Sequence, residues 1–322
     1  MRFMRKTAAI VGTTGLVLGI LTAGQGIASA APATANGTST CTGTITSPGE
    51  LTGTYNNLVI TGACVVQDGT VHVLGNLTVA RGADLTAIFG EDDLTHSGNS
   101  NLYVGGNLYV DQGASVMLGC YSLIVNLWTS ATATSNVPDF PCYDDQNQNA
   151  PTLNTYDVVA GNVIANDPLG LIMHQDTVDG NVIQNGGGAG LGCQNVGIFN
   201  QYFGLPDYSD FSNNIVHGNM LLTNMDTCWN GFLRNVVSGN MSVSDNTSTG
   251  DGTEVGANIV YGNMTCDNNN PAVQTGDSNT TPNKVGGNAF GQCGFGVIIP
   301  NPSPEAGVTV PPTYQPASVP LY

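Results

Sequence analysis

The 322-residue sequence contains few charged side chains, and very few of these are positive. Six Lys and Arg stand against 23 Asp and Glu, and charged residues make up only 9% of the chain. About a quarter is usual in globular proteins. Binding to nucleic acid through phosphates is disfavoured, because it needs clustered Lys and Arg. Disorder is disfavoured as well, since 41% of the residues are hydrophobic.

Several motifs that carry chemistry are also missing. There is no C-x-x-C pair of the kind that binds zinc and no G-x-S-x-G nucleophile motif. The turn Gly186-Gly187-Gly188 is not followed by Lys, so it is not a phosphate loop. After residue 30, Ala, Leu, Glu and Lys do not recur with helical spacing. The sequence therefore predicts an all-β protein without a standard nucleophile.

Residues 1–30 have the features of a signal peptide. Arg2, Arg5 and Lys6 form a positive start, residues 8–21 are apolar, and Ala28-Ser29-Ala30 is a cleavage site. We therefore expect a secreted, extracellular protein with no membrane contact after cleavage. Removal of this segment leaves three Lys and Arg against all 23 acids, so the net charge becomes −20.

A short phrase, Gly-Asn followed by an apolar residue, recurs along the chain. The glycines of the eight copies are Gly75, Gly106, Gly161, Gly180, Gly218, Gly239, Gly262 and Gly287. Four of the seven steps between them are 19, 21, 23 or 25 residues, and a step of 38 is twice 19. A period near twenty residues indicates a solenoid of stacked repeats.

Each phrase stands between short alternating stretches, such as residues 71–74 with 76–79 and residues 235–237 with 240–243. These stretches predict strands of three to five residues joined at a tight Gly-Asn corner. Gly and Asn tolerate the left-handed backbone that such corners use. We expect a single-stranded parallel β-helix, in which the corner asparagines of successive coils form an amide ladder.

Eight cysteines follow the signal peptide, and an even number in a secreted chain predicts disulfides. Residues one coil apart lie about 4.8 Å apart, within reach of a disulfide. We therefore expect sequential pairing: Cys41–Cys64, Cys120–Cys142, Cys193–Cys228 and Cys266–Cys293.

The remaining boundaries follow from composition. Residues 31–40 are expected to be a flexible start, and residues 41–297 the β-helix. A long Asn-, Asp- and Pro-rich loop is expected near 130–155, and an insertion near 198–213. Residues 298–322 form a Pro-rich tail.

The end of the repeat region resembles a known group of proteins. Residues 262–271, Gly-Asn-Met-Thr-Cys-Asp-Asn-Asn-Asn-Pro, and residues 283–293, which end in Gly-Gln-Cys, carry the likeness. They resemble secreted bacterial right-handed parallel β-helix proteins of uncharacterised function, built from Gly-Asn-apolar coils. The resemblance implies a right-handed helix and no particular activity.

Many β-helix proteins cleave polysaccharides, so carboxylates are the candidate catalytic residues. Hydrolysis of a glycoside needs two facing carboxylates. The weak candidates are Glu91, Asp92, Asp93, Asp144 and Asp145, although adjacent acids are more typical of surface turns. A lyase is disfavoured, because few basic groups remain and an acidic chain repels polyanions.

We expect no cofactor, but structural calcium is left open at oxygen-rich segments such as residues 245–254. Tyr103, Tyr109, Tyr121 and Trp128 are considered as an aromatic strip for sugars, with core packing as the commoner explanation. The leading hypothesis is a non-enzymatic surface or matrix protein whose partner is a polysaccharide or a cell-surface protein. The alternative is a polysaccharide hydrolase or lyase that uses a carboxylate cluster.

Overall fold

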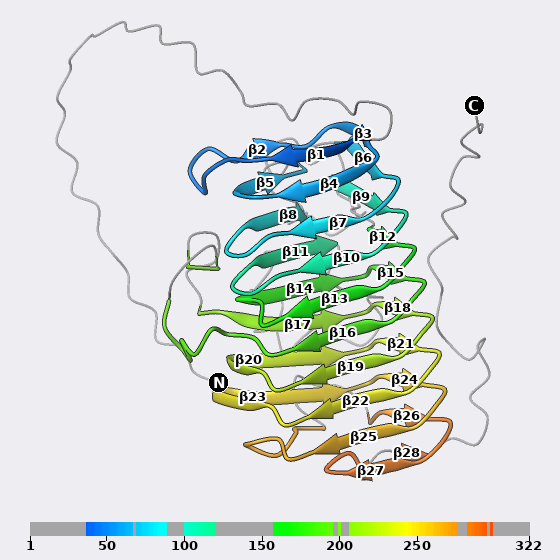
Figure 1. The fold of residues 1–322 in the computed structure, drawn as a ribbon. Helices are drawn as coiled ribbons and strands as arrows, with labels where there is room; N and C mark the ends of the chain where they lie inside the picture. The colour runs from blue at the N-terminus through cyan, green and yellow to red at the C-terminus, as the bar shows by residue number, and fades with distance from the viewer. Residues whose placement is uncertain are drawn as a thin grey trace, which may run out of the picture.

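The computed structural model describes residues 37–66, 69–88, 100–119, 157–195, 199–200, 206–275, 282–294 and 297–298. These residues form one stack of coils, and Figure 1 shows successive coils from the blue to the orange end of the chain. Neighbouring strands pair in parallel within three sheets. The predicted parallel β-solenoid is therefore confirmed. Within these ranges, no helix has the length and apolar character needed to cross a membrane.

The first sheet has ten strands, and its side chains alternate between the interior and the surface. In Val163–Asn166, for example, Val163 and Ala165 are buried whereas Asn166 is exposed. In sheet order the strands are Thr38–Cys41 (β1), Asn57–Ile60 (β4), Leu77–Val79 (β7), Leu108–Val110 (β10), Val163–Asn166 (β13), Val182–Asn185 (β16), Met220–Thr223 (β19), Met241–Ser244 (β22), Met264–Asp267 (β25) and Ala289–Gly291 (β27).

The third sheet also has ten strands, and most of them are only two residues long. In every two-residue strand whose burial is described, the second residue points inward. This residue is always Val. The strands are Gly53–Tyr55 (β3), Gly69–Val73 (β6), Ser100–Val104 (β9), Val158–Val159 (β12), Thr177–Val178 (β15), Ile215–Val216 (β18), Val236–Val237 (β21), Ile259–Val260 (β24), Lys284–Val285 (β26) and Val297–Ile298 (β28).

The second sheet has eight strands and differs from the others, because several of its strands are buried on both faces. The strands are Gly49–Glu50 (β2), Ala63–Val65 (β5), Asp84–Ile88 (β8), Ser115–Gly119 (β11), Gly170–His174 (β14), Tyr208–Ser212 (β17), Asp226–Leu233 (β20) and Thr247–Gly256 (β23).

Two sequence-based assignments in this sheet are wrong. Residues 208–212 were expected in an insertion, but they form β17, which pairs with β14 and β20. Residues 247–254 were considered as an oxygen-rich loop, but they belong to β23. Burial of both faces removes the polar–apolar alternation by which a strand is recognised.

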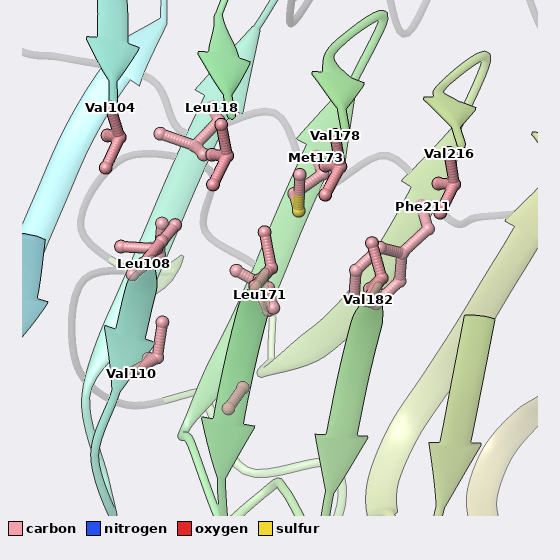
Figure 2. Packing of buried hydrophobic residues seen from close by; sticks show 14 of the residues in the cluster. Val104, Leu108, Val110, Leu118, Leu171, Met173, Val178, Val182, Phe211 and Val216 are labelled. Carbon is pink, nitrogen blue, oxygen red and sulfur yellow. The ribbon is translucent and has the colours of Figure 1, made fainter. Parts of the chain in front are cut away.

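The interior is a continuous column of apolar side chains. Figure 2 shows Val104, Val178 and Val216 of the third sheet and Leu108 and Val182 of the first sheet pointing into the same space. Stacking is necessary because one coil is too small to enclose its own apolar face. The fold thus depends on contacts between neighbouring coils.

The Gly-Asn corners form the predicted amide ladder. The Oδ1 of each corner asparagine accepts the backbone N–H of the asparagine in the next coil at 2.8–2.9 Å, through Asn57, Asn76, Asn107, Asn162, Asn181, Asn219, Asn240, Asn263 and Asn288. Asn57 follows Asn56 rather than glycine, so the sequence repeat did not reveal the first member of the ladder.

The reason expected for the corner glycines is wrong. None of the eight has a positive φ angle. Glycine is required instead because neighbouring coils approach closely: a Cβ on Gly180 would lie 2.5 Å from the carbonyl oxygen of Gly161 and 2.7 Å from Oδ1 of Asn162. In several coils left-handed residues occupy the other two corners, as Asp245 and Ala257 illustrate.

Three of the expected disulfides are present, namely Cys41–Cys64, Cys193–Cys228 and Cys266–Cys293, with Cα separations of 6.4, 4.6 and 5.1 Å. These three pairings are confirmed. The expectation that each disulfide joins equivalent positions of neighbouring coils holds for one pair only. Cys193 and Cys228 are neighbours beside a parallel bridge between Gly192 and Thr227. The other two disulfides do not join equivalent positions, because Cys41 pairs in register with Ile60 and Cys266 with Gly291.

The solenoid begins slightly earlier than expected, because β1 starts at Thr38 within the segment 31–40. The last described strand ends at Ile298. The signal peptide, the loop near 130–155, the Cys120–Cys142 pair and residues 299–322 lie outside the described residues.

Candidate functional site

The five carboxylates proposed from the sequence, Glu91, Asp92, Asp93, Asp144 and Asp145, lie outside the described residues. Residues 89–99 follow β8 and residues 120–156 follow β11, and Ile88 and Gly119 are paired neighbours at the ends of those strands. The two segments that carry these acids therefore begin after paired residues of adjacent strands.

The structure reveals other polar residues, on the outer face of the second sheet. The register defines a middle row along this face: Thr86, Met117, Ile172, Asp210, Gly231 and Glu254. Two carboxylates therefore stand on alternate strands, separated only by a glycine. We call Asp210, Glu254 and their partners His174, Ser212 and Trp229 the outer polar cluster.

Asp210 is held from two sides. Nε2 of His174, on the neighbouring strand, lies 2.8 Å from Oδ2 of Asp210. The hydroxyl of Ser212 donates to Oδ1 of Asp210 at 2.6 Å. The contacts run from Ser212 to Asp210 and from Asp210 to His174. This arrangement orients the Asp210 carboxylate.

Glu254 is held by the indole of Trp229, whose Nε1 donates to Oε1 at 3.1 Å. The indole lies over Gly231, where the absence of a Cβ leaves room for the ring. The Trp229 ring thus fills the gap between the two carboxylates. Asp210 and Glu254 are 8% and 4% exposed, so water has little access to either in this conformation.

Aromatic rings extend the cluster along the sheet. Tyr208 packs against Trp229 with ring centres 5.5 Å apart and against Phe199 at 5.2 Å. Phe199 is fully buried and lies over Gly170, leaving no space there for a Cβ. This part of the outer face is therefore a second apolar layer rather than an open surface.

A further carboxylate is buried close to this region. Asp207 immediately precedes β17 and is fully buried, and neither of its carboxylate oxygens has a hydrogen-bond partner within the described structure. Burial raises the pKa of Asp207 to about 7. This residue titrates near neutral pH and has to be separated from other groups in any experiment on pH.

The outer face of the first sheet has a different character. One row of outward-facing side chains on four neighbouring strands is apolar and consists of Tyr109, Ile164, Ile183 and Leu221. The next outward row consists of amides and hydroxyls, Asn166, Asn185, Thr223 and Ser244. We call the rows formed by these eight residues the paired outer rows; none of the eight is charged, and the second row continues into Asp267 in the next coil.

The two described residues of the aromatic strip considered from the sequence lie on different faces of the solenoid. Tyr103 lies on the third sheet, where its ring packs at 5.7 Å from that of His72. Tyr109 lies on the first sheet. A Gly-Asn corner separates the two faces, and Tyr121 and Trp128 lie outside the described residues.

Across the parts of the chain that the structure describes, no three His, Cys, Asp or Glu side chains gather to hold a metal ion. The chain matches no protein-family model, no curated protein and no solved structure.

The outer polar cluster was missed, although the repeat contained a signal for it. Asp210, Gly231 and Glu254 each stand eight residues before the glycine of a Gly-Asn phrase. Residues at a constant offset from a repeated corner occupy one row of a solenoid. Comparing offsets rather than adjacent acids would have identified the pair.

Proposed function

We propose that this chain is a secreted binding protein that holds neutral polysaccharide on the paired outer rows of the first sheet. The observation that carries this proposal is the juxtaposition of an apolar row with an amide and hydroxyl row. Neutral sugars present C–H faces beside hydroxyl edges, so a sugar chain finds both kinds of partner along one line. A solenoid offers such a line over many coils.

Charge supports the choice of a neutral ligand. The chain carries a formal net charge of −17 as written. Polyanionic sugars would be repelled, whereas a neutral polymer is unaffected. Secretion is inferred from the start of the sequence, and the described disulfides fit an oxidising compartment. We also infer a right-handed solenoid, because parallel crossover connections are almost always right-handed.

Replacing Ile183 with Asp is expected to weaken binding at least tenfold. Ile183 lies in the middle of the apolar row, between Ile164 and Leu221. A carboxylate there must lose water when a sugar face covers it. Binding is measured by depletion of the protein on insoluble chitin, cellulose and neutral glucans, with a glycan array alongside.

The matched control is Ile215→Asp, which places the same charge on the outer face of the third sheet. Ile215 is likewise an outward strand residue, in register with Thr177 and Val236. This variant should bind like the wild type. Equal loss in both variants, or no retention of the wild-type protein on any neutral polymer, would overturn the proposal.

A second candidate function is hydrolysis of a neutral glycoside by Asp210 and Glu254. The specific observation in its favour is that Gly231 separates them across two strand spacings, about 9–10 Å between their backbones. Inverting glycosidases use two carboxyl groups about 6.5–9.5 Å apart. Access to the pair would require the Trp229 ring to move from the gap.

Release of reducing ends from the same polysaccharides tests this candidate. Asp210→Asn and Glu254→Gln should each reduce release at least a hundredfold, because each removes one of the two carboxylates. Asp226→Asn alters an exposed acid at the start of β20 and should leave release unchanged. If the wild-type protein binds the polymer but releases no sugar, the hydrolase function is contradicted and the binding function is supported.

A further inference from the structure

A second, buried amide ladder runs along the corner between the second and third sheets. Its asparagines are Asn214, Asn235, Asn258 and Asn283, all at most 1% exposed. Nδ2 of Asn235, for example, donates to Oδ1 of Asn258 at 3.0 Å and to the carbonyl oxygen of Phe211 at 2.7 Å. Each side-chain nitrogen of the ladder donates to a backbone carbonyl oxygen of the preceding coil. The nitrogens of Asn214, Asn235 and Asn258 also donate to Oδ1 of the next asparagine in the ladder.

Two aspartates continue the same ladder toward the N-terminus. Asp157, Asp176 and the four asparagines all stand four residues before the glycine of a Gly-Asn phrase. The backbone N–H of Asp176 donates to Oδ1 of Asn214 at 2.9 Å, as the backbone of Asn214 does to Asn235. Asp157 and Asp176 are both 1% exposed.

The ladder geometry requires a donor at the position of Asp176. In the asparagines, one side-chain atom accepts and the other donates. An aspartate places an oxygen where the amide nitrogen stands, and neither carboxylate oxygen of Asp176 has a hydrogen-bond partner within the described structure. A protonated carboxyl supplies one donor and one acceptor and therefore replaces the amide.

Asp157 differs from Asp176 in its partners. Its two oxygens accept the backbone N–H groups of Leu102 at 2.6 Å and Gly119 at 2.8 Å. These two donors lower the pKa of Asp157. Burial raises the pKa of both carboxyls, and the neighbouring Asp157 charge raises the pKa of Asp176 further.

We propose that Asp176 carries a proton at neutral pH in place of a ladder amide, and that its ionisation makes the coil boundary at Asp157 and Asp176 sensitive to alkali. Gly119 and Asp157 flank residues 120–156 in the chain, and the Asp157 carboxylate accepts the backbone N–H of Gly119. Ionising Asp176 beside Asp157 therefore weakens the solenoid at this coil boundary.

Other charged groups do not explain the effect. Among the described residues of the neighbouring strands, Tyr103 points to the outer face of the third sheet. His174 pairs with Asp210 on the outer face of the second sheet.

Asp179, shortly after Asp176, pairs with His217 at 2.9 Å, and both side chains are about half exposed. Asp157 is thus the charge that acts on Asp176.

The direction of the pH dependence follows from linkage. A carboxyl whose pKa is raised by folding contributes stability that is fully present below its unfolded value, near pH 4. That stability is lost as the pH rises through the folded value. The wild-type protein should therefore lose stability as the pH rises from about 4 toward the folded value of Asp176.

Asp176→Asn tests the proposal, because it supplies the amide directly. All measurements use a background in which Asp207 is replaced by Asn, so that Asp207 does not add its own step near pH 7. In that background, Asp176→Asn should raise the unfolding temperature by about 3–8 °C at pH 8 and have little effect at pH 4. The curve of unfolding temperature against pH should become flatter.

A spectroscopic measurement separates protonation from packing. The infrared carbonyl band of a buried carboxylic acid should be present at pH 7 in the Asp207→Asn background and lost when Asp176→Asn is added. Asp157→Asn, the matched change in the neighbouring coil, should leave that band in place. Absence of the band, or an unchanged pH slope with Asn at 176, would overturn the proposal.

Discussion

Replacing Asn235 with Ala is expected to lower the free energy of unfolding by about 3–5 kcal/mol. Asn235 makes four side-chain hydrogen bonds: it accepts from the backbone N–H and Nδ2 of Asn214, and it donates to Phe211 and Asn258. The residue is fully buried, so water does not replace the lost partners. Each buried polar group left without a partner costs about 1–3 kcal/mol. Urea denaturation followed by circular dichroism measures the effect.

The matched control is Asn240→Ala, in the ladder at the Gly-Asn corner. Asn240 also bonds to both neighbouring coils, through Asn219 and Asn263, but its side chain is exposed. Water satisfies the abandoned groups there, so a loss of about 1 kcal/mol or less is expected. Equal losses at the two sites would show that burial of the ladder is not what stabilises it.

Asn235→Asp provides a further check. It reproduces in the middle of the ladder the situation proposed for Asp176. This variant should be nearly as stable as the wild type at pH 4 and much less stable at pH 8, because the ionised carboxylate has no donor function. Similar destabilisation at both pH values would contradict the idea that a protonated carboxyl replaces the amide.

Replacing both Cys266 and Cys293 with Ala is expected to loosen the C-terminal coil, at a local cost of about 3–4 kcal/mol. The estimate follows from closing a loop of 27 residues. Both cysteines are fully buried in the interior column. Each coil of a solenoid is held mainly by its neighbours, so an end coil has fewer contacts to lose before it opens. Hydrogen exchange should accelerate in β25 and β27 while β4 and β7 keep their protection.

The Cys41–Cys64 pair offers the mirror-image control. Replacing both cysteines with Ala should accelerate exchange in β1 and β4 and leave β25 and β27 unchanged, because this disulfide joins residues of β1 and β5. If either double variant lowered protection evenly along the whole chain, the solenoid would unfold as one cooperative unit. The local interpretation of the end disulfides would then fail.

The solenoid and much of its register were predictable from one repeated phrase. Gly-Asn marks a corner where the coils approach too closely for a side chain, so it recurs wherever a coil turns there. Constant offsets from that glycine identify the apolar row containing Ile164 and Ile183, three residues after it. They also identify the buried ladder containing Asp176 and Asn235, four residues before it. These positions follow from the period alone.

The second sheet could not be predicted in the same way. Strands such as β14 and β17 are buried on both faces, so their side chains do not alternate in polarity. The sequence likewise could not show why glycine stands at the corners, because glycine is favoured both by a left-handed backbone and by a lack of room for a Cβ. Only the backbone angles and the distances between coils in the structure distinguish these two explanations.

The sequence by itself determined the repeat, the short strands on either side of each Gly-Asn corner and the pairing of the cysteines in the described region. These features depend on period and on residue type, which are properties of the chain. The tertiary structure alone decided which polar residues meet. Asp210 and Glu254 are 44 residues apart in the chain, and they face each other only because Gly231 in the coil between them leaves the space that Trp229 occupies.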